Sequence, residues 1–219
     1  MKGVWLLLLL LFIGRFDRWS LSAIGILRQQ HVRAIIGPEI MSTTFDLQPT
    51  LKGRLLELRP LRVSDFRDLY AVASDPFIWE QHPVKDRWNE DVFKQFFRES
   101  LHSGGALVVI DSKDGQVIGS SRFHGYDEQK GEVEIGWTFL ARSHWGGVYN
   151  REMKELMLRH AFNFVDRVVF LVGPQNLRSQ RAVEKIGGVR AGSRRDGSGR
   201  NSFVYEITAS TFAEMFEER

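Results

Sequence analysis

The chain of 219 residues contains no cysteine. Without a thiol it cannot form a disulfide, a thiolate zinc site or a cysteine nucleophile. A reducing compartment is compatible with this composition, and the expected location is the cytoplasm. No metal site is expected.

Most of the chain also lacks an excess of charge of one sign. The formal net charge is +3, and residues 1–40 alone carry five Lys/Arg against two Asp/Glu. Residues 41–219 therefore sum to zero, with 25 basic and 25 acidic side chains. A neutral domain gives no electrostatic reason to expect nucleic acid as a partner.

A hydrophobic run long enough to span a bilayer is missing. The apolar run Val4–Ile13 has ten residues, whereas a membrane-spanning helix needs about 20. Three interpretations of residues 1–40 stay open. In the first, Met41 is the true start. In the second, residues 1–27 are a signal-like or membrane-surface segment, with a cleavage site near Leu21-Ser22-Ala23. In the third, residues 1–40 are an unexplained extension.

Domain signals begin after Met41. We expect a leader at 41–53, one domain at 54–210 and a tail at 211–219. Alternating or continuous apolar patterns predict strands at 54–59, 106–111, 116–126, 132–139, 167–172, 189–195 and 202–208. Helical spacing and caps predict helices at 64–74, 89–101, 148–165 and 176–186, with Ser64, Asn89 and Asn176 as N-caps. Turns are expected at 113–115 and 196–199.

The resulting order is β-α-α-β-β-β-α-β-α-β-β. It predicts an α/β (mixed α+β) fold with a mixed, mostly antiparallel sheet of about seven strands. On the helix at 148–165, the apolar stripe is expected to contain Met153, Leu156, Met157, Ala161 and Phe164. Arg151, Lys154, Glu155 and Arg159 are expected outside it.

The segment from Trp145 to Asn150 is the most informative part of the chain. Its glycines, Gly146 and Gly147, lie between a strand and the start of a helix. Backbone N–H groups at a helix start have no partner within the helix, and the helix dipole adds positive charge there. The segment therefore predicts an anion site suited to a diphosphate.

Three pieces of sequence in this order resemble the GNAT acyltransferase superfamily, and within it the branch that includes the ribosomal-protein N-terminal acetyltransferases. They are Glu134-Ile135-Gly136-Trp137, then Trp145 to Glu152, then Asn176-Leu177-Arg178-Ser179 followed by Glu184-Lys185-Ile186-Gly187-Gly188. The resemblance covers nearly all of residues 54–208.

The resemblance implies acetyl-CoA as the acyl donor. The N–H groups of Gly146, Gly147, Val148, Tyr149 and Asn150 would bind its diphosphate. The fourth and fifth strands would splay apart, and the pantetheine arm would lie in the gap along Trp137, Phe139 and Leu140. Asn176 and Ser179 would contact the cofactor near its thiol.

Two positions depart from the family pattern. Ser143 stands where the family prefers Gln or Arg, and Val148 stands where it prefers Gly or Ala. A β-branched Val still presents its backbone N–H, but its side chain would crowd a phosphate.

Acetyl transfer to an amine requires removal of a proton from an ammonium whose pKa is about 8 to 10.4. Glu134 is the candidate general base, because it lies on the strand that would line the cleft. The alternative is a cross-strand partner for Arg122 or Lys130.

Other candidates carry weaker signals. Ser179 is the candidate acid for the departing thiolate, or else a first-turn helix serine; residues 187–200 contain no tyrosine for that role. His144 is expected to pack in its loop rather than to relay a proton. Residues 79–83 would border the acceptor, and Arg194, Arg195 and Arg200 are expected to form a solvated basic tip.

The sequence thus predicts an N-acetyltransferase that transfers acetyl from acetyl-CoA directly to a primary amine, on a protein N-terminus or a small molecule. The alternative is a non-catalytic acyl-CoA binding or sensing domain of the same fold. A second alternative is a membrane-associated enzyme held at a surface by residues 1–27.

Overall fold

One eight-stranded sheet organises residues 44–195 and 199–216, the part of the chain that the computed structural model describes. Its strands lie side by side in the order β1-β2-β3-β4-β5-β6-β8-β7. Their bounds are β1 Leu51–Lys52, β2 Leu56–Pro60, β3 Ala106–Asp111, β4 Val117–Asp127, β5 Glu132–Leu140, β6 Arg167–Val172, β7 Val189–Arg195 and β8 Asn201–Thr208. Every neighbouring pair is antiparallel except β5 and β6, so the predicted mixed, mostly antiparallel sheet is confirmed.

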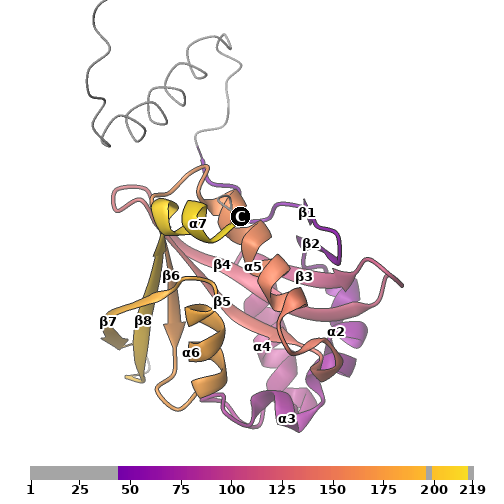
Figure 1. Ribbon diagram of the computed structural model, residues 1–219. Coiled ribbons are helices and arrows are strands. Elements are labelled where there is room, and N and C mark those ends of the chain that lie inside the picture. The colour runs from indigo at the N-terminus through magenta and orange to yellow at the C-terminus, as the bar shows by residue number, and fades with distance from the viewer. Residues whose placement is uncertain (1–43, 196–198, 217–219) are drawn as a thin grey trace, which may run out of the picture. The chain divides into compact units, whose positions relative to one another are not determined.

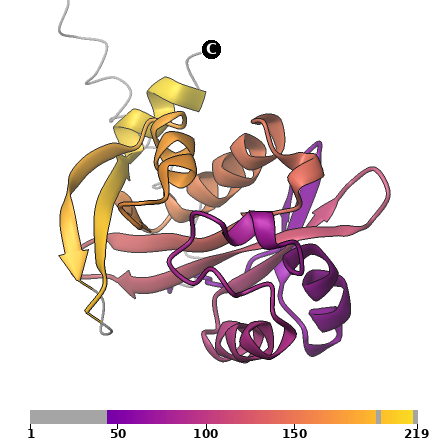
Figure 2. The same cartoon turned by 90° about the horizontal axis from the view of Figure 1, so that it is seen from below.

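Helices cover both faces of this sheet (Figure 2). The helices α2 (Phe66–Ala73) and α4 (Glu90–His102) lie on one face, and α5 (Val148–Ala161) and α6 (Leu177–Glu184) lie on the other. The short helix α3 (Pro76–Trp79) joins α2 to α4, and α7 (Ala209–Phe216) follows β8. No helix among the described residues is long and apolar enough to cross a membrane.

A separate apolar core fills each face. Between the sheet and α5, Met153, Met157 and Leu158 pack against Val133 and Ile135 of β5. The other core is aromatic, with Trp79, Phe93, Phe96, Phe97 and Phe139. Aromatic rings dominate burial on this face, so α2 and α4 are held against the sheet largely by ring contacts.

Strands β5 and β6 pair only over their first residues, from Glu132↔Arg167 to Glu134↔Val169. Beyond Glu134, β5 continues beside β4, while β6 continues beside β8. Figure 1 shows the two strands diverging from a common end. The predicted splay between the fourth and fifth predicted strands is therefore confirmed.

A β-bulge interrupts β5 within this splay. Arg122 of β4 pairs with Gly136, whereas Ser120 pairs with Phe139, so Trp137 and Thr138 together face one residue of β4. Trp137 has φ 51°, in the left-handed region that a non-glycine residue seldom adopts. The extra residue shifts the alternation of the strand: Val133 and Ile135 belong to the core under α5, whereas Trp137 and Phe139 pack into the aromatic core on the other face.

Local predictions had mixed outcomes. Asn89 and Asn176 are N-caps as predicted, and their side chains accept from Asp91 and Ser179 N–H groups. Ser64 is not one: a 3-10 turn, Val63–Asp65, precedes α2, and the Asp65 carboxylate accepts the Arg62 N–H instead. The segments β1, α3 and α7 were not predicted, and residues 196–198 of the predicted 196–199 turn lie outside the described residues.

The prediction for Lys154 was wrong. Its side chain is 5% exposed and lies against the sheet rather than in solvent. The helical stripe facing the core therefore runs through Lys154 as well as Met153 and Met157, because all three positions lie within one turn of the same face.

Candidate active site

The glycines of the turn before α5 lie beside open space. Gly146 has φ 102° and Gly147 has φ 135°, and no atom would lie within 4 Å of a Cβ added at either glycine. The first hydrogen bond of α5 runs from Arg151 N–H to Gly147 C=O. Within the described residues, the N–H groups of 146–150 donate to no acceptor, so the helix start presents free donors.

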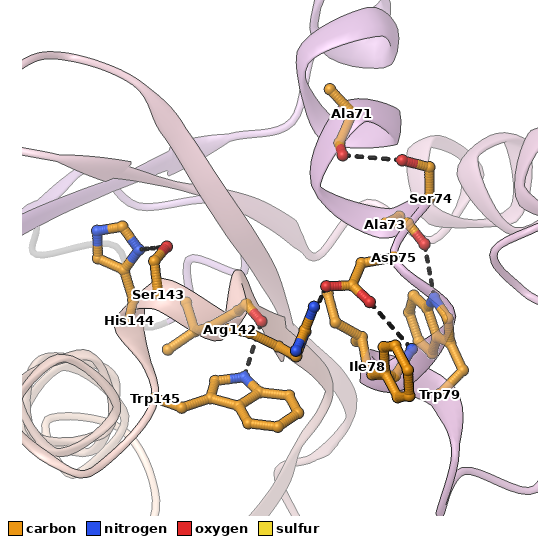
Figure 3. Close-up of polar contacts among 12 residues, drawn as sticks. Ala71, Ala73, Ser74, Asp75, Ile78, Trp79, Arg142, Ser143, His144 and Trp145 are labelled. Atoms are coloured by element: carbon orange, nitrogen blue, oxygen red, sulfur yellow. Dashed lines mark hydrogen bonds and ion pairs between the residues drawn. The ribbon is translucent and has the colours of Figure 1, made fainter.

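Side chains on either side hold this turn in place (Figure 3). Arg142 forms an ion pair with Asp75, at the start of α3, with Nε 2.5 Å from the carboxylate oxygen. The Trp145 indole donates to the Leu140 carbonyl at 2.9 Å. The donors of the turn are therefore fixed before any ligand arrives, which lowers the ordering cost of binding.

Arg178, on the first turn of α6, connects three segments. Its guanidinium lies 4.1 Å from the centre of the Trp145 ring. Its Nη2 donates to the Ile78 carbonyl at 2.7 Å, and its backbone N–H donates to Gln81 Oε1 at 3.0 Å. The glycine turn, α6 and the segment from α3 to Gln81 are thus joined by one residue, through both its side chain and its backbone N–H.

A cleft of about 950 Å³ runs from this turn into the gap between β5 and β6. Nine of the ten predicted cofactor-binding residues line it, namely Trp137, Phe139, Leu140, Gly146, Gly147, Val148, Asn150, Asn176 and Ser179. Tyr149 does not line it: its hydroxyl donates to Asp111 at 3.2 Å. The far wall of the cleft comes from the segment after α3, with Gln81, His82, Pro83 and Arg87.

We call the part of the cleft formed by residues 146–150, α6 and the strand gap the donor half. The part formed by residues 78–87 and Trp137 is the acceptor half.

Asn176 has one side-chain atom in use and one free. Its Oδ1 accepts the Ser179 N–H at 3.1 Å, which caps α6. Its amide N–H₂ makes no hydrogen bond within the described residues, although the side chain lines the cleft. Helix capping and ligand contact are therefore compatible at this residue.

Lys154, on α5, also lines this cleft. Its ammonium donates to Thr138 Oγ1 at 2.6 Å and to Ser121 Oγ at 3.3 Å, and both acceptors are neutral hydroxyls. Burial lowers the pKa of Lys154 to about 7. The cleft thus contains a group whose charge is easily changed near neutral pH.

Glu134 lies on β5 where the strands part, and its carboxylate folds over Gly136. It forms an ion pair neither with Arg122 nor with Lys130, because Lys130 pairs with Asp127. Burial raises the pKa of Glu134 to about 7, and nearby Arg194 and Arg122 only partly oppose this. Glu134 does not itself line the cleft, whereas its neighbours Ile135, Gly136 and Trp137 do.

The remaining candidates have structural partners. His144 lies between Asp111, with Nε2 3.1 Å from the carboxylate, and Ser143, with Nδ1 2.9 Å from Oγ, and packs against Tyr149. Arg194 lies 3.5 Å from the Glu132 carboxylate. Among the residues described, no group of three His, Asp or Glu side chains could hold a metal ion.

The sequence did not indicate that Lys154 and Arg87 line the cleft, or that Arg122 stacks on Trp137. Lys154 follows Asn150 by one helical turn, and that spacing could have placed it on the cleft side. No sequence pattern places Arg87 or Arg122 at the site. Arg87 lies in a loop, and Arg122 lies in a strand where it looks like a surface residue.

Comparisons with known proteins agree with this geometry. The model of the acetyltransferase (GNAT) domain family matches residues 55–189. A curated relative, the uncharacterized N-acetyltransferase p20 of Bacillus licheniformis, is 26% identical over 154 residues, which is 67% of this chain and 86% of the relative.

Solved structures share the fold. The acetyltransferase of Agrobacterium tumefaciens is 25% identical with a TM-score of 0.58, over 73% of this chain and 94% of that one. Mycobacterium smegmatis RimJ, solved in complex with CoA-disulfide, is 21% identical with a TM-score of 0.55, over 74% and 87% of the two chains. The splayed sheet with a glycine turn at its mouth is that of an acyltransferase fold, and the chain belongs to the GNAT acetyltransferase family.

Proposed function

We propose that the protein transfers an acetyl group from acetyl-CoA directly to a primary amine, with the cytoplasm as its site of action. The observation that carries the proposal is the continuity of the cleft. Free N–H donors at the start of α5 open into the gap between β5 and β6, and Asn176 and Ser179 line the same space.

The residues fit a coenzyme A donor. The open space in front of Gly146 and Gly147 leaves room for a diphosphate, and the N–H groups behind it are unpaired within the described residues. The parted edges of β5 and β6 offer unpaired backbone groups to the amides of a pantetheine arm. The relative solved with CoA-disulfide supports the same donor for this chain.

The bound thioester would supply an activated acetyl group. Since the chain has no cysteine, the acceptor amine must attack it directly. Glu134 is the candidate general base: a carboxylate whose pKa is about 7 accepts a proton near neutral pH more readily than an ordinary glutamate does. Because Glu134 does not itself line the cleft, the proton would reach it through a bridging water.

Lys154 and Ser179 are the candidates for assisting the departing thiolate. Both line the cleft. The Lys154 ammonium is held by two neutral hydroxyls, so its positive charge is available to an anionic sulfur. No tyrosine lies in residues 187–200, which leaves these two side chains to supply a proton or a charge.

Two measurements test the proposal. Calorimetric titration with coenzyme A should give saturable one-to-one binding, and thiol release from acetyl-CoA should depend on an added amine. A panel of primary amines, including short peptides with free N-termini, is needed because the acceptor is open.

One observation favours a non-catalytic acyl-CoA binding domain. The Val148 side chain is 66% exposed at the turn that would bind the diphosphate. A bulky side chain there narrows the space through which a diphosphate would reach the backbone N–H groups. Saturable binding of coenzyme A without thiol release on any amine would establish that alternative, and absence of binding would exclude both.

A further inference from the structure

Two arginines lie around the acceptor half: Arg87, which is partly exposed, and Arg122, which is buried. The Arg87 guanidinium carbon lies 5.1 Å from the centre of the Trp79 ring and 4.4 Å from that of Phe96. The Arg122 guanidinium carbon lies 4.4 Å from the Trp137 ring and 5.9 Å from the same Phe96 ring. Arg87 lines the cleft directly, and Arg122 lies behind Trp137.

Neither arginine is neutralised. Among the residues described, no carboxylate lies within the 4.0 Å that defines an ion pair with Arg87 or Arg122. The Nε atom of each is buried and has no hydrogen-bond partner. Arg122 is only 5% exposed, so solvent does not replace the missing partner.

The groups that do contact these arginines are neutral. Arg122 Nη2 donates to the Ser100 hydroxyl at 2.5 Å. Arg87 Nη1 lies 3.2 Å from His82 Nε2, and burial together with the charge of Arg87 lowers the pKa of that histidine to about 3. Glu99 and Glu134 lie close enough to raise the pKa of Arg122, but burial outweighs them and lowers it to about 10.

Stacking on aromatic rings does not by itself explain this arrangement. A cation over a ring contributes about 0.5–2 kcal/mol. A buried charge without a counterion costs several kcal/mol, which is why neutral side chains of similar volume are usually at least as stable in such places. This cost applies to the buried Arg122, and the buried Nε of Arg87 also lacks a partner, so the acceptor half is short of an anion that the described residues do not provide.

We propose that the acceptor is a small amine that also carries a carboxylate, as an amino acid does, and that Arg87 binds this carboxylate with Arg122 behind it. This inference rests on the proposed acetyl transfer and names its substrate class. One guanidinium reaches the cleft, and its two parallel N–H donors match the two oxygens of a carboxylate. A phosphate would leave further oxygens against the rings of Trp79 and Phe96, so the carboxylate fits better.

The charges of the acceptor half suit both ends of such a molecule. Glu134 of β5 lies close enough to Arg122 of β4 to oppose the lowering of its pKa, and its carboxylate lies beside Gly136, the residue before Trp137. The ammonium of an amino acid would face this carboxylate while its carboxylate faces Arg87. An amine without an anionic group would meet an uncompensated positive field instead.

The test compares amines that differ only in the anionic group. Thiol release from acetyl-CoA is measured with a panel of amino acids and the matching α-carboxamides, with ethanolamine and phosphoethanolamine as a further pair. We expect kcat/KM to be at least about tenfold higher for the best amino acid than for its carboxamide. Arg87→Gln should abolish this preference, Arg87→Lys should retain part of it, and Arg98→Gln, an exposed arginine of α4, should leave it unchanged.

A binding readout separates this inference from the proposed function. Trp79 and Trp137 lie against the two arginines, so their fluorescence should change on titration with the amino acid and not with its carboxamide, and the change should be lost in Arg87→Gln. If the fluorescence responds but no amine releases thiol, acetyl transfer is refuted and the carboxylate site stands. Equal handling of acids and carboxamides in both assays, an equal loss for both in Arg87→Gln, or a preference for phosphoethanolamine would overturn the carboxylate assignment.

Discussion

The two halves of the cleft are built from different parts of the chain. The donor half uses backbone: N–H groups at the start of α5 and the unpaired edges of β5 and β6. The acceptor half uses side chains from a loop and a strand, among them Arg87 and Trp137, with Phe96 and Arg122 packed against them. Backbone donors tolerate substitution as long as the turn keeps its shape, whereas the acceptor half changes with each side chain.

Glu134→Gln should have the largest effect, because it removes the carboxylate while keeping the size of the side chain. General-base catalysis is worth about 10²–10⁴ in rate, so we expect turnover at neutral pH to fall by at least about 100-fold. Affinity for coenzyme A, measured by calorimetry, should stay unchanged. A parallel loss of affinity would assign Glu134 a structural role in the donor half.

The pH dependence sharpens the same contrast. The raised pKa of Glu134, about 7, means that the carboxylate form is lost as pH falls through that value. We therefore expect kcat/KM to rise with pH up to about 7 and to fall about tenfold per pH unit below it. Lys154 also titrates near 7; the step should persist in Lys154→Met and vanish in Glu134→Gln if it belongs to Glu134.

Gly147→Ala should break the donor half through its backbone. Gly147 has φ 135° and ψ −60°, and a side chain there costs about 1–3 kcal/mol through strain alone. Since space around the glycine is open, the cost comes from conformation and not from a clash. We expect coenzyme A to bind about tenfold more weakly. Gly192→Ala, also in open space but without a positive φ, is the matched control and should bind normally.

Asn176→Ala should have a moderate effect on the donor half. It removes the cap of α6 and the free amide that faces the cleft. We expect a loss of about 1–2 kcal/mol in coenzyme A affinity, the scale of one hydrogen bond. Asn176→Asp keeps the capping oxygen but not the amide donor. If Asp restores affinity, only the helix cap matters and Asn176 makes no ligand contact.

Val148→Ala should have the smallest effect. The backbone N–H of residue 148 is the same in both variants, and the Val148 side chain is largely solvent-exposed. We expect coenzyme A affinity to change by less than about 0.5 kcal/mol, or to improve slightly as the approach widens. A loss comparable to that of Gly147→Ala would show that the donor half depends on side chains after all.

The donor half could be predicted because its signals are local. Glycines before an apolar helix at 145–150, an Asn cap at 176 and a continuous apolar strand at 167–172 each have a nearby physical cause, and chain order brings them together. The splay between β5 and β6 followed from the family resemblance, and no residue of either strand indicates by itself where pairing stops.

The acceptor half could not be predicted in the same way. The bulge at Trp137 has no glycine at its positive φ, so the alternation at 132–139 reads as a regular strand. Arg122 then looks like a cross-strand partner for Glu134, when in fact it stacks on Trp137 and donates to Ser100. These contacts join segments far apart in sequence, and such tertiary pairings override local pattern.

Arg178 gives the protein a thermodynamic property that neither half has alone. Its guanidinium stacks on Trp145 and donates to the Ile78 carbonyl, and its backbone N–H donates to Gln81, so one residue borders the sites proposed for both substrates. A donor molecule that shifts Trp145 would also disturb the contacts of Arg178 with Ile78 and Gln81 on the acceptor side. By thermodynamic linkage, the acceptor would change the affinity for the donor by the same factor as the donor changes the affinity for the acceptor. We therefore expect the apparent affinity for each substrate to change with the concentration of the other, which steady-state kinetics with both substrates varied can measure.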